Sequence, residues 1–182
     1  MKWFKRQRKA PNSADVADAF AFQLLRLSVD FVEDASQDLK RLLGIQERSQ
    51  LAKVREELLF FSWFALDYWT SDSLFVHTQE ERRTIKEALS YHWREIAGGG
   101  YEGQAILYTL QERLNAYAQI VNEEKGDNAK FLGFGKKLSE FCGMPEKSLL
   151  LGIPAGELFT KTMDSVCIAC KSWREFVEGA DT

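Results

Sequence analysis

A run of nine residues, Leu58 to Leu66, constrains this chain more than any other feature of its 182 residues. The run reads Leu-Leu-Phe-Phe-Ser-Trp-Phe-Ala-Leu and has no charged side chain. A helix through it is apolar on every side, and such a helix has to be surrounded by other elements. Because the run is far shorter than the roughly 20 residues of a membrane span, we expect it at the centre of a water-soluble helical bundle.

Apolar residues recur at helical spacing in most of the remaining chain, and no alternating pattern of a strand competes. Thr78-Gln79-Glu80-Glu81 has the pattern of a helix-capping box, and glycines at 44, 98–100 and 143 are expected stops. The expected helices span about 13–43, 46–69, 78–97, 102–124, 129–142 and 154 to the C-terminal end. The sequence therefore predicts an all-α, single-domain bundle of about six mostly antiparallel helices, with the second helix central.

Two details of this architecture are predicted from short segments. Leu149-Leu150-Leu151-Gly152-Ile153 is apolar but short and interrupted by glycine, so we expect it to cover one end of the core. The last helix is expected to begin at about Pro154, because proline is favoured in a first turn. The first two helices are expected to form the long antiparallel pair.

The first twelve residues differ in character from residues 13–182, which are expected to form the bundle. Residues 1–10 carry five cations and no acid, so the rest of the chain has a net charge of −8. Basic aromatic segments can bind an anionic membrane surface or an acidic partner, although many short basic ends bind nothing. The residues that would make this contact are Lys2, Trp3, Phe4, Lys5, Arg6, Arg8 and Lys9.

The composition gives little support to metal or redox chemistry. The chain has two histidines, His77 and His92, and no Glu-x-x-His pair of the kind that binds metal in di-iron bundles, so no metal or cofactor is expected. The motif Cys167-Ile168-Ala169-Cys170 lies inside the expected last helix. Reactive cysteine pairs usually lie at the N-terminus of a helix, so we interpret these two cysteines as small apolar residues of the core. The odd total of three cysteines does not suggest disulfides, so a cytoplasmic location is expected. The basic N-terminal segment adds a peripheral location at the membrane as an alternative.

One candidate site follows from the central helix. Asp67 is the only charged side chain between Leu58 and Trp69, so it should be partly buried and need a partner. His92 lies on the same helical stripe as Ile85, Leu89 and Ile96, and could form an acid–base pair with Asp67. Tyr68 and Arg113 are candidate ligand-binding neighbours. The alternative is that Asp67 caps a turn and His92 is an ordinary core residue.

The leading functional hypothesis is a non-enzymatic module that binds another protein or itself, with the N-terminal segment as an additional contact. The alternative is a small-molecule-binding or acid–base catalytic bundle with a pocket around Asp67 and His92. Enzymatic activity is not favoured, because the sequence shows neither a nucleophile set nor a metal set. DNA binding is a lesser alternative, since residues 137–149 resemble a helix-turn-helix only weakly and the body is acidic.

Overall fold

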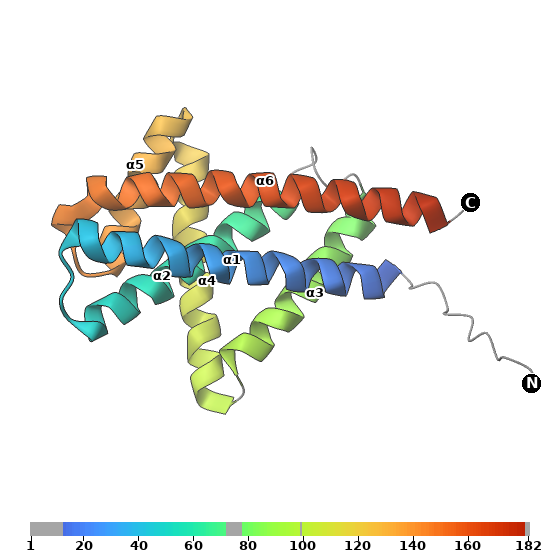
Figure 1. Cartoon of the computed structure of the whole chain (residues 1–182), viewed down its shortest axis with the longest axis horizontal. Coiled ribbons are helices and arrows are strands. Elements are labelled where there is room, and N and C mark those ends of the chain that lie inside the picture. Colours follow the sequence, from blue (N-terminus) through green and yellow to red (C-terminus); the bar gives the residue numbers. More distant parts are fainter. Residues whose placement is uncertain (1–12, 72–77, 99, 181–182) are drawn as a thin grey trace, which may run out of the picture.

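The computed structural model describes residues 13–71, 78–98 and 100–180. Within them it contains six α-helices, one short 3-10 helix and no strand (Figure 1), which confirms the predicted all-α bundle. The elements are α1 (Ser13–Leu43), α2 (Arg48–Ser71), α3 (Gln79–Ala97), α4 (Gly100–Glu123), α5 (Asp127–Phe141), η1 (Pro145–Lys147) and α6 (Ser148–Ala180).

The second helix is central, as predicted. Leu58 and every residue from Phe60 to Leu66 are buried, and α2 packs against α1, α3, α4, α5 and α6. Phe61 belongs to one core cluster, together with Phe64, Tyr117 and Phe134. A second cluster surrounds Leu66, on the side of α2 that faces the N-terminal half of α1 and α3. The apolar run thus joins two groups of core side chains.

The longest antiparallel pair is α1 with α6, which lie side by side in opposite directions (Figure 1). The two helices have 31 and 33 residues. The sequence predicts α2 as the partner of α1, but α2 crosses behind α1 obliquely although the two helices are in contact. Because α2 is apolar on every side, it can be covered by several helices at different angles and does not need one parallel partner.

The last helix begins earlier than predicted, at Ser148 instead of about Pro154. Residues 149–153 are therefore helical and do not form an irregular cover for the core. Proline inside a helix removes one backbone hydrogen bond, and here α6 tolerates Pro154. Close packing of these first turns against α5 offsets that loss, since Gly152 lies directly against Gly135.

The third helix shows the predicted capping box and a shifted core face. Thr78 accepts a hydrogen bond from the Glu81 amide at 3.1 Å, and the Glu81 carboxylate accepts one from the Thr78 amide at 3.0 Å. The buried residues are Ile85, Leu89 and Trp93, while Ile96 is 55% exposed. The prediction that Ile96 faces the core is wrong, because the buried stripe continues in steps of four to Trp93 instead.

Candidate functional site: a groove between α5 and α6

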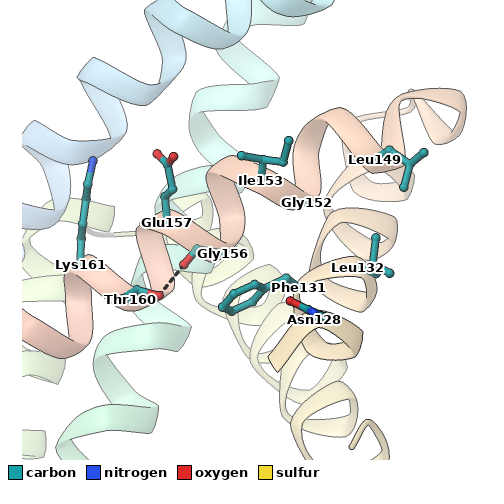
Figure 2. Close-up of a pocket in the computed structure, with 10 residues that line it drawn as sticks. All are labelled: Asn128, Phe131, Leu132, Leu149, Gly152, Ile153, Gly156, Glu157, Thr160 and Lys161. Atoms are coloured by element: carbon teal, nitrogen blue, oxygen red, sulfur yellow. Dashed lines mark hydrogen bonds between the residues drawn. The ribbon is translucent and has the colours of Figure 1, made fainter. Parts of the chain in front are cut away.

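A groove of about 860 Å³ runs between α5 and the first turns of α6 (Figure 2). We call it the α5–α6 groove. Its walls and floor are formed mainly by apolar side chains and glycines: Phe131, Leu132, Leu149, Gly152, Ile153 and Gly156. Asn128 lies on the α5 side, while Glu157, Thr160 and Lys161 extend the groove along α6.

Three glycines bring the two helices close together. A methyl group on Gly135 would lie 2.4 Å from the Cα of Gly152 and 2.4 Å from the carbonyl oxygen of Ser148. The ring of Phe131 lies between the helices and faces Gly156, where a methyl group would be 2.9 Å from the ring (Figure 2). Because these contacts involve backbone or a tightly packed ring, the floor of the groove is rigid.

Two rows of α6 side chains, each spaced by four residues, form one side of the groove. The inner row is Gly152, Gly156 and Thr160, and the Thr160 hydroxyl donates a hydrogen bond to the Gly156 carbonyl at 3.0 Å (Figure 2). The outer row is Leu149, Ile153, Glu157 and Lys161, and all four of these residues are exposed. Small residues in the inner row leave the hollow open, and the outer row offers apolar contact at one end and charge at the other.

Large apolar side chains are exposed around the groove. Leu149 is 70% exposed, Ile153 67% and Leu132 on α5 53%. A single exposed leucine needs no explanation, but a group of them beside a hollow is typical of an interaction site.

A second hollow of about 490 Å³ lies on the other side of α6, toward α1, and shares Ile153, Glu157 and Lys161 with the groove. It also contains Asp34, Asp38 and Arg41 from α1. Within the described part of the chain, no ion pair engages Asp34, Asp38 or Glu157. The first turns of α6 therefore stand between two hollows, with these carboxylates on one side.

The predicted contact between Asp67 and His92 is wrong. Asp67 pairs with Lys86 on α3, with 3.1 Å between Oδ1 and Nζ. His92 lies 2.9 Å from Asp18 on α1, measured from Nε2 to Oδ1, although the angles do not make a hydrogen bond. Because the core face of α3 runs through Trp93, His92 is rotated toward α1 and away from α2.

Tyr68 and Arg113, the two candidate ligand-binding residues, do not line the same pocket. Tyr68 lines a pocket of about 580 Å³ between α2, α3 and α4, together with Asp67. Neither His92 nor Arg113 lines this pocket, which we call the three-helix pocket. The Arg113 guanidinium instead binds Glu57, with Nε–Oε2 and Nη2–Oε1 distances of 2.8 and 3.0 Å. It also lies over the Phe141 ring, with Cζ 3.7 Å from the ring centroid.

Glu57 is a buried charged residue that was not among the residues predicted from the sequence. Its side chain is only 4% exposed, against 13% for Arg113. Nearby, burial raises the pKa of the Cys142 thiol to about 12, and the negative charge of Glu57 contributes to that rise. Burial also raises the pKa of Tyr117 well above its ordinary value, again with Glu57 adding to the effect. A thiol with such a pKa stays protonated near neutral pH, so Cys142 is no nucleophile there.

The remaining candidates from the sequence are the two cysteines of the last helix and the N-terminal contact residues. Cys170 is buried in the core as predicted, whereas Cys167 is exposed and the prediction that it packs in the core is wrong, because only Cys170 lies on the buried face of α6. The N-terminal contact residues 2–9 lie outside the described residues. Among the described residues there is no group of three or more metal-ligating side chains, and no described helix is both long and apolar enough to cross a membrane.

Comparisons of the chain with family models, with curated proteins and with solved structures each find no match. The function of the chain is therefore inferred from its fold and from the α5–α6 groove.

Proposed function

We propose that this protein is an interaction module that binds an amphipathic helix of a partner protein in the α5–α6 groove. The observation that supports this most directly is the gathering of exposed Leu132, Leu149 and Ile153 around the groove. Covering side chains of this size stabilises a complex by about 1.5–3 kcal/mol for each one that is fully buried.

The shape of the groove favours a helix as the bound segment. The groove lies between two helices, and its α6 side has side chains in steps of four residues. A third helix with apolar residues at every third or fourth position can pack into such a surface. The rigid glycine floor means that little of the binding energy is lost in reshaping the site.

The charges of the adjoining hollow, on the side of α6 that faces α1, favour a basic polar face on the bound helix. Asp34, Asp38 and Glu157 are exposed carboxylates without an ion-pair partner among the described residues. Arg41 and Lys161 only partly balance them. Complementary charge at the edge of an interface increases the association rate and selects among partners.

A fluorescently labelled model helix of leucine and lysine tests this proposal. Its binding is followed by fluorescence anisotropy, with wild-type protein and with Ile153→Asp and Ile168→Asp. Both isoleucines lie on α6 and both are 67% exposed, but only Ile153 lines the groove. We expect Ile153→Asp to weaken binding tenfold or more, because one buried isoleucine contributes about 1.4 kcal/mol or more. Ile168→Asp should change the affinity less than about twofold.

Three results would overturn the proposal. The first is no measurable binding, and the second is an equal loss of affinity in both variants. The third is a concentration-dependent dimer in sedimentation that Ile153→Asp abolishes and Ile168→Asp does not, which would make a second copy of the chain the bound partner. A leucine and glutamate helix of the same length serves as the charge control and should bind more weakly than the lysine helix.

A further inference from the structure

The three-helix pocket opens beside a row of cations on α3. A hollow of about 720 Å³ lies along α3 and contains Arg82, Lys86 and Arg94, which are spaced by four or eight residues. We call these three residues the α3 basic row. Ser90 and Arg94 line both hollows, so the pocket and the basic row adjoin. We propose that together they bind a small organic anion that contains an aromatic ring.

The apolar part of the site is built from buried aromatic rings. Trp63 of α2 and Trp93 of α3 both line the three-helix pocket and are 7% and 6% exposed. Their rings are tilted by 35° with centroids 5.1 Å apart. Leu110 of α4 is also buried at this pocket. These side chains come from three helices and form a floor against which a planar ring can lie. A ligand ring can pack on the tryptophan rings in the offset or edge-to-face arrangements that aromatic pairs prefer.

The polar part of the site has an excess of positive charge. The two hollows contain four cations, Arg82, Arg83, Lys86 and Arg94, against two carboxylates, Asp67 and Glu87. Asp67 is paired with Lys86 and Glu87 with Arg83. Within the described part of the chain, no acid pairs with Arg82 or Arg94. This local excess stands out in a chain with a net charge of −3.

These two halves define the class of ligand. An arginine guanidinium binds carboxylate, sulfonate or phosphate oxygens through paired N–H groups, so Arg94 at the border of both hollows is the expected anchor. A pocket of about 580 Å³ has the size of known small-molecule sites. A ligand whose ring lies against Trp63 and Trp93, and whose anionic group points toward Arg94, contacts both the apolar and the polar part of the site.

Two fluorescent probes with the same ring system distinguish the contribution of the aromatic ring from that of the anionic group. Anilinonaphthalene sulfonate is an aromatic anion, and phenylnaphthylamine is the same ring system without the sulfonate. Wild-type protein is expected to bind the anion more tightly than the neutral probe, with an affinity that falls as salt is added. Arg94→Gln should weaken binding of the anion about tenfold and leave the neutral probe unchanged, because one charge-assisted contact is lost.

The controls place the probe in this pocket. Arg26→Gln removes a cation exposed on α1, outside both hollows, and should leave both affinities unchanged. Ile153→Asp disrupts the α5–α6 groove and should also leave the tight binding of the anion unchanged. The proposal is overturned if the two probes bind equally, if Arg94→Gln and Arg26→Gln have the same effect, or if Ile153→Asp removes the binding. None of these results overturns the proposed helix partner, because that proposal is tested with a different ligand.

Discussion

At the scale of single residues, the buried pair of Glu57 and Arg113 is the most consequential polar contact in the described structure. It links α2 to α4 with two hydrogen bonds inside a region that is otherwise apolar. Removing two charges from water is costly, and their attraction offsets that cost only when the geometry is good. We therefore expect the pair to fix the alignment of α2 and α4 rather than to add much stability.

Removing one partner of this pair should be much more costly than removing both. We expect Arg113→Met to reduce the free energy of unfolding by about 3–5 kcal/mol, because Glu57 is left charged and buried. The double variant Glu57→Leu/Arg113→Met should recover most of that loss. Urea denaturation measures the stability of both variants. Arg83→Ala is the control, because the exposed ion pair of Arg83 with Glu87 contributes less than about 1 kcal/mol. A double variant no more stable than Arg113→Met would contradict this account.

The burial of Glu57 could have been predicted from the sequence, but its partner could not. Glu57 lies three residues after Val54 and four before Phe61, so it shares a helical face with two residues that are fully buried. That position identifies a buried carboxylate. Arg113, however, lies 56 residues away in the chain, and no local pattern connects the two.

At the scale of helices, the crossing of α5 and α6 determines the shape of the groove. Gly133 and Gly135 both lie in α5 and both lower its helix propensity. Their surroundings differ, because a methyl group on Gly135 would meet the backbone of α6, whereas one on Gly133 would meet the Ile120 side chain. Only the first contact is between helix backbones.

Alanine substitutions at these two glycines should differ clearly in their effect on stability. Gly135→Ala is expected to destabilise the protein by about 3 kcal/mol, because the two helices would have to move apart. Gly133→Ala should remain within about 1 kcal/mol of wild type, since a side-chain shift is offset by better helix propensity. Thermal and urea denaturation compare them. An equally small effect of both substitutions would show that the helices are not held by this contact.

At the scale of the whole molecule, the two raised pKa values predict a loss of stability in alkali. The folded protein keeps the Cys142 thiol and the Tyr117 hydroxyl protonated at a pH where the unfolded chain releases both protons. Their contribution to stability is therefore complete below the ordinary cysteine pKa of 9.0 and declines as the pH rises toward about 12. Each group that titrates only in the unfolded chain lowers stability by up to about 1.4 kcal/mol per pH unit.

Urea denaturation at a series of pH values from about 8 to about 11 tests this prediction. Cys142→Ala should reduce the alkaline slope, and Tyr117→Phe should reduce it further above the ordinary tyrosine pKa of 10.0. Cys167→Ser is the matched control, because Cys167 is an exposed thiol, and should leave the slope unchanged. If Cys142→Ala and Cys167→Ser give the same pH profile, burial of the Cys142 thiol is not the cause.

Local patterns in the sequence were sufficient to predict the helices and the one that lies at the centre. Both follow from the spacing of apolar residues along a single helix, and from the apolar run at Leu58–Leu66, which has to be covered on every side. The capping box at Thr78 and the glycine after α3 are equally local, and the structure shows both.

The start of α6, the partners of Asp67 and Glu57, and the α5–α6 groove emerge only when the helices pack together. Each of these depends on how one helix is rotated and tilted against another. Spacing within one helix carries no information about that rotation. Gly152 and Pro154 weaken a helix when considered alone, and only the close approach of Gly135 across the crossing shows why α6 begins before them.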